Sequence, residues 1–383
     1  MRRFEEIGVI GDGAFGIVQK CRDKETGEIV AIKKMKQRYA TFDECLQLKE
    51  VKSLRKIKHE NVMRLLQVFR ENDHLYLVTE FYPDGSLLKT IQNHNKPFTE
   101  DEVRNVIGQL LEGLAFVHRQ GFFHRDIKPE NLLWSGNTLK IADFGLAREI
   151  RSRPPYTEYV STRWYRAPEI VLHHEFYNSP VDIWAVGCIM AELFTLRPLF
   201  QGNSETDQIF KICSILGTPG PGNWPDGQRL ATRLGIRLPQ SSHTPLSVAV
   251  PNASQEAISL LKDLLQLDPM KRPSATQALQ HPFFKNHQQK SPEPTNNANA
   301  QPQAKKETQS PSSSHTSTER SQLPMSPSHA RNNSTSFKQS NNILDQNFSK
   351  PLNFGTNKDD SHHRTFSFHN TPDNEIDDIF EDL

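Results

Sequence analysis

The sequence lacks several features that would assign it to a well-marked class of protein. It has no CxxC pair, and its four cysteines are far apart in the chain, at Cys21, Cys45, Cys188 and Cys213. This pattern argues against a disulfide framework and a zinc site, and it is typical of reduced thiols in a cytosolic or nuclear protein. Long apolar runs and a secretory leader are missing too, so we expect neither secretion nor insertion into a membrane.

The chain also lacks an excess of either charge. It has 46 Lys and Arg against 45 Asp and Glu, a net charge of +1. Because neither a basic nor an acidic field dominates, we expect no nucleic-acid partner and no binding to a membrane surface. Apolar residues make up only 35%, and the 19 glycines raise this to about 40%, below the ~45–50% of an average globular domain. Part of the chain is therefore expected not to pack.

One sharp change of character divides the chain. The apolar spacing of strands and helices runs from Phe4 to about Phe284, and beyond Asn286 the sequence is mostly Ser, Thr, Asn, Gln, Pro and charge. We expect an α+β fold with a small β-rich lobe over 4–82 and a larger helical lobe over 83–284. The stretch 285–383 is expected to be a largely disordered, low-complexity tail, because it has too little apolar area to offset the entropy of ordering.

Local patterns predict individual elements. Short β-branched and apolar runs at 29–32 and 75–78 predict strands. Apolar residues at helical spacing predict helices at 44–57, 103–117 and 254–267. A hinge between the two lobes is expected near Phe81–Gly85.

The first motif along the chain is a glycine-rich loop at 11–18. Its eight residues are Gly11, Asp12, Gly13, Ala14, Phe15, Gly16, Ile17 and Val18. Three glycines at this spacing let the backbone approach phosphate oxygens without a Cβ in the way. Alone, the pattern fits a dinucleotide fold or a flexible turn equally well. The loop is succeeded by a second strand pattern ending at Lys33, and not by the helix and downstream acid of a dinucleotide site, so that alternative drops away.

Lys33 and Glu50 are candidates for an ion pair that binds nucleotide phosphates. Lys33 ends the predicted strand Val30–Lys33, and Glu50 lies on the helix expected at 44–57. A lysine held by a helical acid can reach α- and β-phosphate oxygens. Taken singly, each of these residues is more often a solvated surface charge.

A second group of polar residues is far more specific. The run 124–131 reads HRDIKPEN, and DFG comes after it at 143–145. Asp126 can accept a proton from a hydroxyl, and Lys128 can lie near a transferred phosphoryl group. Asn131 and Asp143 offer the oxygen ligands that magnesium prefers. Each residue alone also fits an ordinary turn, but chance is a poor explanation for the ordered set.

Together these motifs resemble eukaryotic protein kinases, over roughly residues 4–284. The resemblance rests on the glycine loop, VAIK, HRDIKPEN, DFG, APE at 167–169, DIW at 182–184 and Arg272, in that order. It implies a bilobal kinase fold, ATP and Mg²⁺ as cofactors, and catalysis by Asp126, Lys128, Lys33 and Glu50, with Asn131 and Asp143 holding metal. It also implies that the nucleotide is bound by the glycine loop, Val18, Ala31 and Lys33, and by hinge residues Glu80 and Tyr82.

Further phrases narrow the resemblance. The Lys-Pro-Glu segment is similar to the serine/threonine class, and TEY at 157–159 with VSTRWYRAPE is similar to the CMGC branch of cyclin-dependent and mitogen-activated kinases. MKQRY, RENDHLY, GFFHRD and WAVGCIMAEL resemble the male germ cell-associated and intestinal cell kinases. That family implies control of cilium or flagellum length and intraflagellar transport, in the cytoplasm, at the cilium and in the nucleus.

The resemblance also implies a switch and a substrate preference. Phosphate on Thr157, added by an upstream kinase, and on Tyr159 would activate the enzyme. Lys49, Arg125 and Arg148 would bind the Thr157 phosphate, although both sites also fit ordinary exposed hydroxyls. Arg163 and Arg166 would shape a peptide site for Ser or Thr followed by Pro, with a basic residue upstream.

The tail and the rival functions remain open at this point. Ile376, Ile379, Phe380 and Leu383 lie at helical spacing among acids, so an acidic amphipathic helix at 375–383 could dock on a partner, pack on the kinase or stay disordered. A monomer acting on protein substrates is expected. A pseudokinase or scaffold is the alternative, and a small-molecule phosphotransferase is weaker. Loss of Lys33, Asp126, Asn131 or Asp143 would favour the scaffold, and all four are present.

Overall fold

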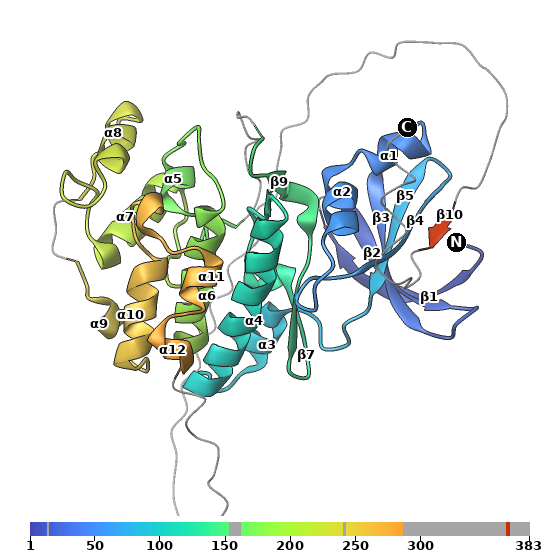
Figure 1. The fold of residues 1–383 in the computed structure, drawn as a ribbon, viewed down its shortest axis with the longest axis horizontal. Helices are drawn as coiled ribbons and strands as arrows, with labels where there is room; N and C mark the ends of the chain where they lie inside the picture. Colours follow the sequence, from blue (N-terminus) through green and yellow to red (C-terminus); the bar gives the residue numbers. More distant parts are fainter. Residues whose placement is uncertain (14, 153–161, 240–242, 286–364, 368–383) are drawn as a thin grey trace, which may run out of the picture. The chain divides into compact units, whose positions relative to one another are not determined.

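The N-terminal part of the chain folds as an antiparallel sheet. The computed structural model describes residues 1–285, except 14, 153–161 and 240–242, together with 365–367. Neighbouring strands follow the order β1-β2-β3-β5-β4-β10. Their bounds are Phe4–Asp12 (β1), Gly16–Asp23 (β2), Ile29–Arg38 (β3), Leu65–Glu71 (β4), His74–Glu80 (β5) and Thr365–Ser367 (β10). The strands predicted at 29–32 and 75–78 are confirmed as parts of β3 and β5 (Figure 1).

The two faces of this sheet belong to different apolar clusters. Along β5, Leu75 and Leu77 join the large core, while Tyr76 and Val78 join a smaller cluster with Phe4. This alternation comes from the period of two along a strand, which sends neighbouring side chains to opposite faces. The face of Leu77 is the one that meets the helix carrying Glu50.

The prediction of a single helix at 44–57 is wrong, because the structure has two helices there. They are α1 (Phe42–Leu46) and α2 (Lys49–Lys56). Gln47 closes α1 through its backbone N–H, and Leu48 is extended, with φ −61° and ψ 138°. The apolar positions keep helical spacing across this break, so periodicity alone did not reveal it.

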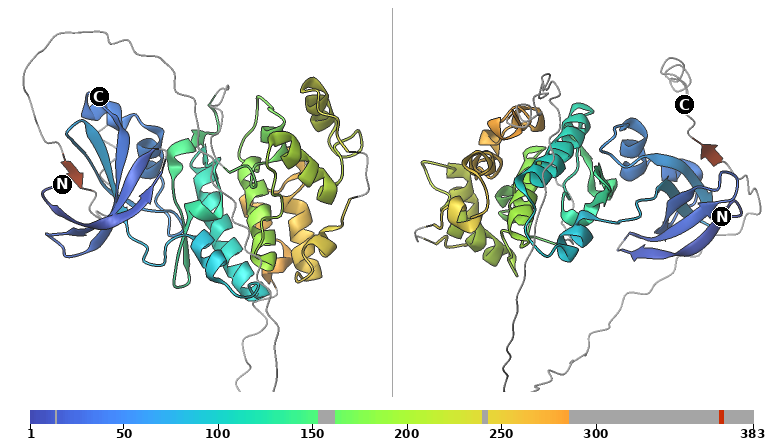
Figure 2. Two further views of the ribbon diagram at one scale, coloured as in Figure 1. Left: turned by 180° about the vertical axis from the view of Figure 1, so that it is seen from behind. Right: turned by 90° about the horizontal axis from the view of Figure 1, so that it is seen from below.

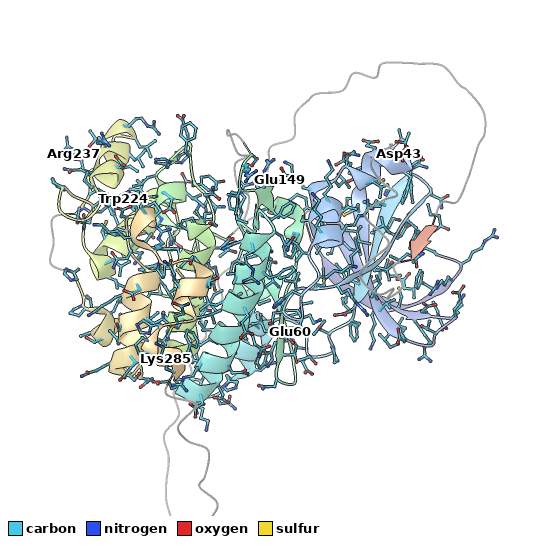
Figure 3. All side chains as sticks on the ribbon, in the orientation of Figure 1. Asp43, Glu60, Glu149, Trp224, Arg237 and Lys285 are labelled. Atoms are coloured by element: carbon cyan, nitrogen blue, oxygen red, sulfur yellow. The ribbon has the colours of Figure 1, made fainter. Side chains whose placement is uncertain are left out.

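The C-terminal lobe is mainly helical, as expected. Its helices are α3 (Leu87–Asn93), α4 (Glu100–Arg119), α5 (Pro168–Val171), α6 (Pro180–Thr195), α7 (Glu205–Leu216), α8 (Pro225–Arg233), α9 (Leu246–Ala249), α10 (Gln255–Leu264), α11 (Ala275–Ala278) and α12 (Pro282–Lys285). Figure 2 shows them from two further sides, and Figure 3 labels Trp224, just before α8, and Lys285, where α12 ends. The helix predicted at 103–117 lies inside α4, and that predicted at 254–267 is the shorter α10.

Helix α6 forms the centre of this lobe. All its residues from Val181 to Phe194 are buried, and it packs against α4 and α10. A mostly apolar helix that is buried on every side belongs to a core. It therefore provides a fixed base for the loops that pack on it.

Short strands and turns of 3-10 helix connect α4 to α5. They are β6 (Phe122–Phe123), η1 (Pro129–Asn131), β7 (Leu132–Ser135), β8 (Thr138–Ile141), η2 (Phe144–Leu146) and β9 (Arg148–Glu149). A further turn, η3 (Pro269–Lys271), comes after α10. Two antiparallel pairs, β6 with β9 and β7 with β8, fix the loops between them. Those loops carry the HRD and DFG motifs.

Some predicted features lie outside the described residues. These are Ala14, Thr157, Tyr159, the helix predicted at 375–383 and nearly all of the tail predicted to be disordered at 285–383. Strand β10, which lies within that tail, was not predicted. The four cysteines are free and buried. Among the described residues, none of the helices is both long and apolar enough to cross a membrane.

Candidate active site

The loop after β6 is held by one buried carboxylate from α6. Asp182 accepts hydrogen bonds from the backbone N–H groups of His124 and Arg125, both at 2.8 Å, and contacts His118 Nε2 at 2.9 Å. Burial alone would raise the pKa of Asp182, but the hydrogen bond and charge of His118, with His124, lower it. Arg125 has a φ of +75°, and these bonds hold the loop in that unfavourable backbone conformation.

Asp126, Lys128 and Asn131 converge on one point. Lys128 Nζ lies 2.8 Å from Asp126 Oδ2, and Asn131 Nδ2 donates to Asp126 O at 2.8 Å and Oδ2 at 2.9 Å. The Asp126 carboxylate is thus fixed by an ammonium and an amide. An anion held in this way can accept a hydroxyl proton beside a positive charge suited to phosphate.

Lys33, Glu50 and Asp143 form a second group. Lys33 Nζ lies 2.8 Å from Glu50 Oε1 and 3.2 Å from Asp143 Oδ1. Burial lowers the pKa of Lys33, but the two carboxylates outweigh it and raise the pKa above its ordinary value. Burial would raise the pKa of Asp143, but the charge of Lys33 has the larger effect and lowers this pKa. The Lys33 ammonium and the Asp143 carboxylate are therefore both charged at neutral pH.

Backbone bonds join the two groups. Ala142 N donates to Asn131 O at 2.9 Å, and His124 Nε2 lies 2.9 Å from Ala142 O. Asp143 itself has a φ of +61°. A Cβ at Gly145 would come 3.3 Å from Asp143 Oδ1 and 3.6 Å from Glu50 Oε2, so a glycine there leaves room for the lysine and its two acids. The HRD and DFG motifs are in this way parts of one site.

The glycine loop connects β1 to β2. Gly13 N donates to Gly16 O at 3.0 Å, and a Cβ at Gly16 would come within 2.6 Å of Lys34 O. Asp12 pairs with Lys36 at 2.7 Å, and Phe15 is about half exposed. The described part of this loop thus brings its backbone next to the strand of Lys33, while Ala14 lies outside the described residues.

The predicted adenine contacts lie where β3 meets β5. Ala31 pairs with Thr79 in the register of the two strands, and Val18 of β2 pairs with Lys33. The Glu80 carboxylate pairs with Arg64 and Lys140, each at 3.0 Å. Because that carboxylate is already paired, we expect the backbone of Glu80 and Tyr82 to make any contact with adenine.

The residues present fit a magnesium ion. Asn131 Nδ2 is bonded to Asp126, which leaves the amide oxygen as the ligand. Asp143 keeps a side chain that is 37% exposed. The described residues include no cluster of three or more His, Cys, Asp and Glu that could hold a metal, so an ion here would complete its coordination with phosphate oxygens and water, as magnesium commonly does.

The residues predicted to bind the Thr157 phosphate come from separate elements. Lys49 is the first residue of α2, and Arg148 lies on β9. The Arg125 guanidinium donates to Tyr177 Oη at 3.1 Å from Nε and to Leu146 O at 3.2 Å. Since Thr157 lies outside the described residues, the phosphate pocket stays a prediction.

Arg163 and Arg166 differ in their surroundings. Arg163 is exposed, whereas Arg166 is buried, with Nη1 3.9 Å from Glu205. Arg163 is thus accessible to a peptide, while Arg166 lines a small cavity together with Asp126 and Lys128, and the part of both residues in a peptide site stays a prediction.

Sequence reasoning missed Thr162, Tyr165 and Glu192. Thr162 lines a small cavity together with Asp126 and Lys128. Tyr165 Oη donates to the buried Glu192 at 2.7 Å. A lone hydroxyl beside Arg163 gave no signal of its own, and the contact between Tyr165 and Glu192 spans 27 residues.

Comparison with known proteins identifies the family. Residues 4–284 match the protein kinase domain. The chain is 57% identical over 285 residues to the serine/threonine-protein kinase ICK of Mus musculus and 55% identical over 285 residues to the serine/threonine-protein kinase MAK of Homo sapiens. Each alignment covers 74% of this chain, and 45% and 46% of the respective relative.

A more distant relative extends the comparison. A probable serine/threonine-protein kinase of Dictyostelium discoideum is 53% identical over 288 residues, covering 74% of this chain and 57% of that protein. The chain therefore spans about half the length of the curated relatives it matches. Its match to the kinase domain over residues 4–284 and its similarity to these relatives show that the chain belongs to the protein kinase family, in the group of the MAK and ICK serine/threonine kinases.

Proposed function

We propose that this chain is a serine/threonine protein kinase that transfers the γ-phosphate of ATP to Ser or Thr in other proteins. The observation that carries the proposal is the complete set of charged contacts, with Lys33 on Glu50 and Asp143, and Lys128 and Asn131 on Asp126. A scaffold would not need both groups intact, and both are intact among the described residues.

Each residue has a distinct part in the reaction. Lys33 binds and orients the α- and β-phosphates, and Glu50 holds its ammonium in place. Asp126 accepts the proton of the attacking hydroxyl, while Lys128 offsets negative charge on the phosphoryl group in transit. Asn131 and Asp143 hold Mg²⁺, which when bound neutralises charge on the nucleotide phosphates.

Activation by phosphate at Thr157 and Tyr159 is part of the proposal. Arg125 supports it, because this residue comes directly after His124 in the catalytic loop and donates to Leu146 O, just beyond the DFG motif. A phosphate that attracts Arg125 would connect the activation segment to both motifs. An upstream kinase would modify Thr157, and Tyr159 would be modified by the enzyme itself.

Substrate choice and cellular role are proposed from resemblance to the relatives. We expect Ser or Thr followed by Pro, with a basic residue upstream, and we assign the peptide site to the exposed Arg163 together with Arg166. A role in cilium or flagellum length and intraflagellar transport, in the cytoplasm, cilium and nucleus, has no support in the chemistry of the site. It rests on the motifs shared with the family.

The first test measures phosphate transfer from Mg-ATP to peptide libraries with and without Pro after the acceptor. We expect Asp143→Asn to lower the rate at least ~100-fold, an order of magnitude typical for loss of a group that stabilises transferring phosphate. Asp263→Asn, on the exposed face of α10, is the matched control and should keep full activity.

The same assay tests the switch. Thr157→Ala should lower the rate while nucleotide binding is retained, and phosphorylation of the wild-type protein at Thr157 should raise it. If a Thr157-phosphorylated sample binds nucleotide but transfers no phosphate, the scaffold alternative replaces the kinase proposal.

A further inference from the structure

A strand from the far end of the chain lies along the edge of the N-terminal sheet. Strand β4 has β5 on one side and β10 on the other. The antiparallel register sets Thr365 opposite Phe69, Phe366 opposite Val68 and Ser367 opposite Gln67. Figures 1 and 2 show β10, in red, beside this sheet. Without β10, β4 would be the outermost strand.

The part of β4 that faces β10 is buried. Val68 is 1% exposed, Gln67 5% and Phe69 7%. The Phe69 ring stacks on Phe4 at 5.9 Å and on Tyr76 at 4.9 Å between ring centres. These stacks hold the strand from its face, so that its backbone keeps the extended shape that strand addition requires.

The end of β4 is anchored as well. Arg70 Nε donates to Tyr39 O at 2.8 Å, and the amino group of Met1 lies 3.0 Å from Glu71 Oε2. A strand edge with unpaired backbone groups tends to pair with an extended chain that reaches it. Left uncovered, the β4 edge would therefore be open to pairing with other extended chains.

The sequence around β10 suits this position. Residues 365–368 read TFSF, an alternation of polar and aromatic residues in a tail composed mostly of Ser, Asn, Gln, Pro and charge. Thr and Phe favour strands, and the period of two is that of a strand with one apolar face. The segment thus differs from the polar sequence on both sides of it.

We propose that the β4 edge is a strand-docking site and that its occupant is the chain's own segment Thr365–Ser367. Main-chain hydrogen bonds supply the affinity, and the covalent link to the kinase domain supplies a high effective concentration. A partner that offers an extended segment to this edge has to displace β10 first. The site lies on β4, away from the catalytic contacts, and it does not depend on the proposed activity.

Cysteine cross-linking in the full chain tests the register. Facing residues of antiparallel strands have Cα atoms about 4.5–5.5 Å apart, within the range of a disulfide. Gln67→Cys with Ser367→Cys should therefore form an intramolecular cross-link under mild oxidation, with little background because the four native cysteines are buried. Glu71→Cys with Ser367→Cys, four residues out of register, is the matched control.

Two outcomes of this experiment would overturn the proposal. Equal cross-linking of the in-register and out-of-register pairs would mean that β10 has no fixed place on β4. Cross-links formed only between two molecules would assign the edge to a second copy of the chain.

Hydrogen exchange gives an independent readout in the full chain. Phe366→Pro removes a backbone donor and fixes φ, so it disrupts a three-residue strand without touching the kinase core. We expect exchange of the peptide covering 65–71 to rise about tenfold, the size expected when one or two hydrogen bonds are lost. Asn370→Pro, beyond the strand, should have no effect. Unchanged exchange at β4 in Phe366→Pro would refute the docking site.

Discussion

At the scale of single residues, buried carboxylates carry out opposite tasks in this protein. Asp182 is fully surrounded and stays charged, because two backbone N–H groups and His118 satisfy it. Glu192, on the same helix, accepts a hydrogen bond from Tyr165, and the negative charge of Glu130 acts on it. Burial raises the pKa of Glu192 to about 7. Glu192 therefore keeps its proton between pH 4.5 and about 7, a range in which an ordinary glutamate is ionised.

Glu192 therefore predicts a pH dependence of stability. Its pKa is 4.5 in the unfolded chain and about 7 when folded, so the folded state binds more protons between these values. The free energy of unfolding should then fall as pH rises from about 4.5 to 7. Glu192→Gln keeps an acceptor for Tyr165 and removes this loss. We expect the variant to exceed the wild type by roughly 1–3 kcal/mol at pH 8.

Thermal or urea unfolding across about pH 5–8 measures this difference. The advantage of Glu192→Gln should shrink toward the acidic end of that range, whereas Glu256→Gln, exposed on α10, should match the wild type throughout. An advantage of the same size at every pH would show that Glu192 is charged in the native state.

At the scale of elements, the sequence predicted what depends on local periodicity. The short apolar run from Leu75 to Val78 indicated β5, and the helical spacing over 103–117 indicated α4. It could not separate α1 from α2, because the break at Leu48 changes backbone angles and leaves the apolar spacing intact. Nor did it reveal β10, because a strand pattern of three residues is too short to stand out until its pairing with β4 is known.

The active-site residues also divide into those that the sequence predicts and those that it does not. Motif residues such as Asp126 and Asp143 were predictable because their order in the chain is distinctive. Thr162 and the pair of Tyr165 with Glu192 were not, since only tertiary packing brings them to their partners. Patterns in neighbouring residues predict secondary structure and motifs, whereas contacts between residues far apart in the chain leave no pattern of this kind in the sequence.

Helix α4 gives a test at this scale. Thr99 and Glu102 form a capping box, in which Thr99 N donates to Glu102 Oε2 at 2.7 Å and Glu102 N donates to Thr99 Oγ1 at 3.4 Å. Thr99→Ala removes the hydroxyl acceptor at the start of a 20-residue helix. We expect a loss of about 1 kcal/mol in chemical unfolding. Thr99→Ser, which restores the hydroxyl, should recover most of it, and equal losses in both variants would point to the methyl group instead.

At the scale of the whole molecule, one buried ion pair joins distant parts of the C-terminal lobe. Glu169, on α5, accepts two bonds from Arg272, at 2.6 and 2.7 Å, although 103 residues separate them. Arg272 also donates to Pro180 O at 3.0 Å, at the start of α6, and its guanidinium lies 5.0 Å from the Trp184 ring centre. The segment after Thr162 is thus connected to the core helix.

Breaking this pair should be costly. Arg272→Ala leaves the buried Glu169 carboxylate without its partner, and we expect a loss of about 3–5 kcal/mol in the free energy of unfolding. Arg229→Ala, which removes an exposed ion pair with Asp226, is the matched control and should cost at most about 1 kcal/mol. Similar losses in the two variants would show that the buried pair contributes no more than a surface one.

The burial of all four cysteines has a practical consequence. Cys21 and Cys45 lie in the N-terminal lobe, and Cys188 and Cys213 lie on α6 and α7. Burial raises the pKa of each thiol, to about 11 for Cys45 and Cys213, so the native protein presents neither an accessible thiol nor a thiolate to an alkylating reagent. Each cysteine becomes a reporter that is silent until its own lobe opens, and the order in which the four are alkylated would show which half of the kinase domain unfolds first.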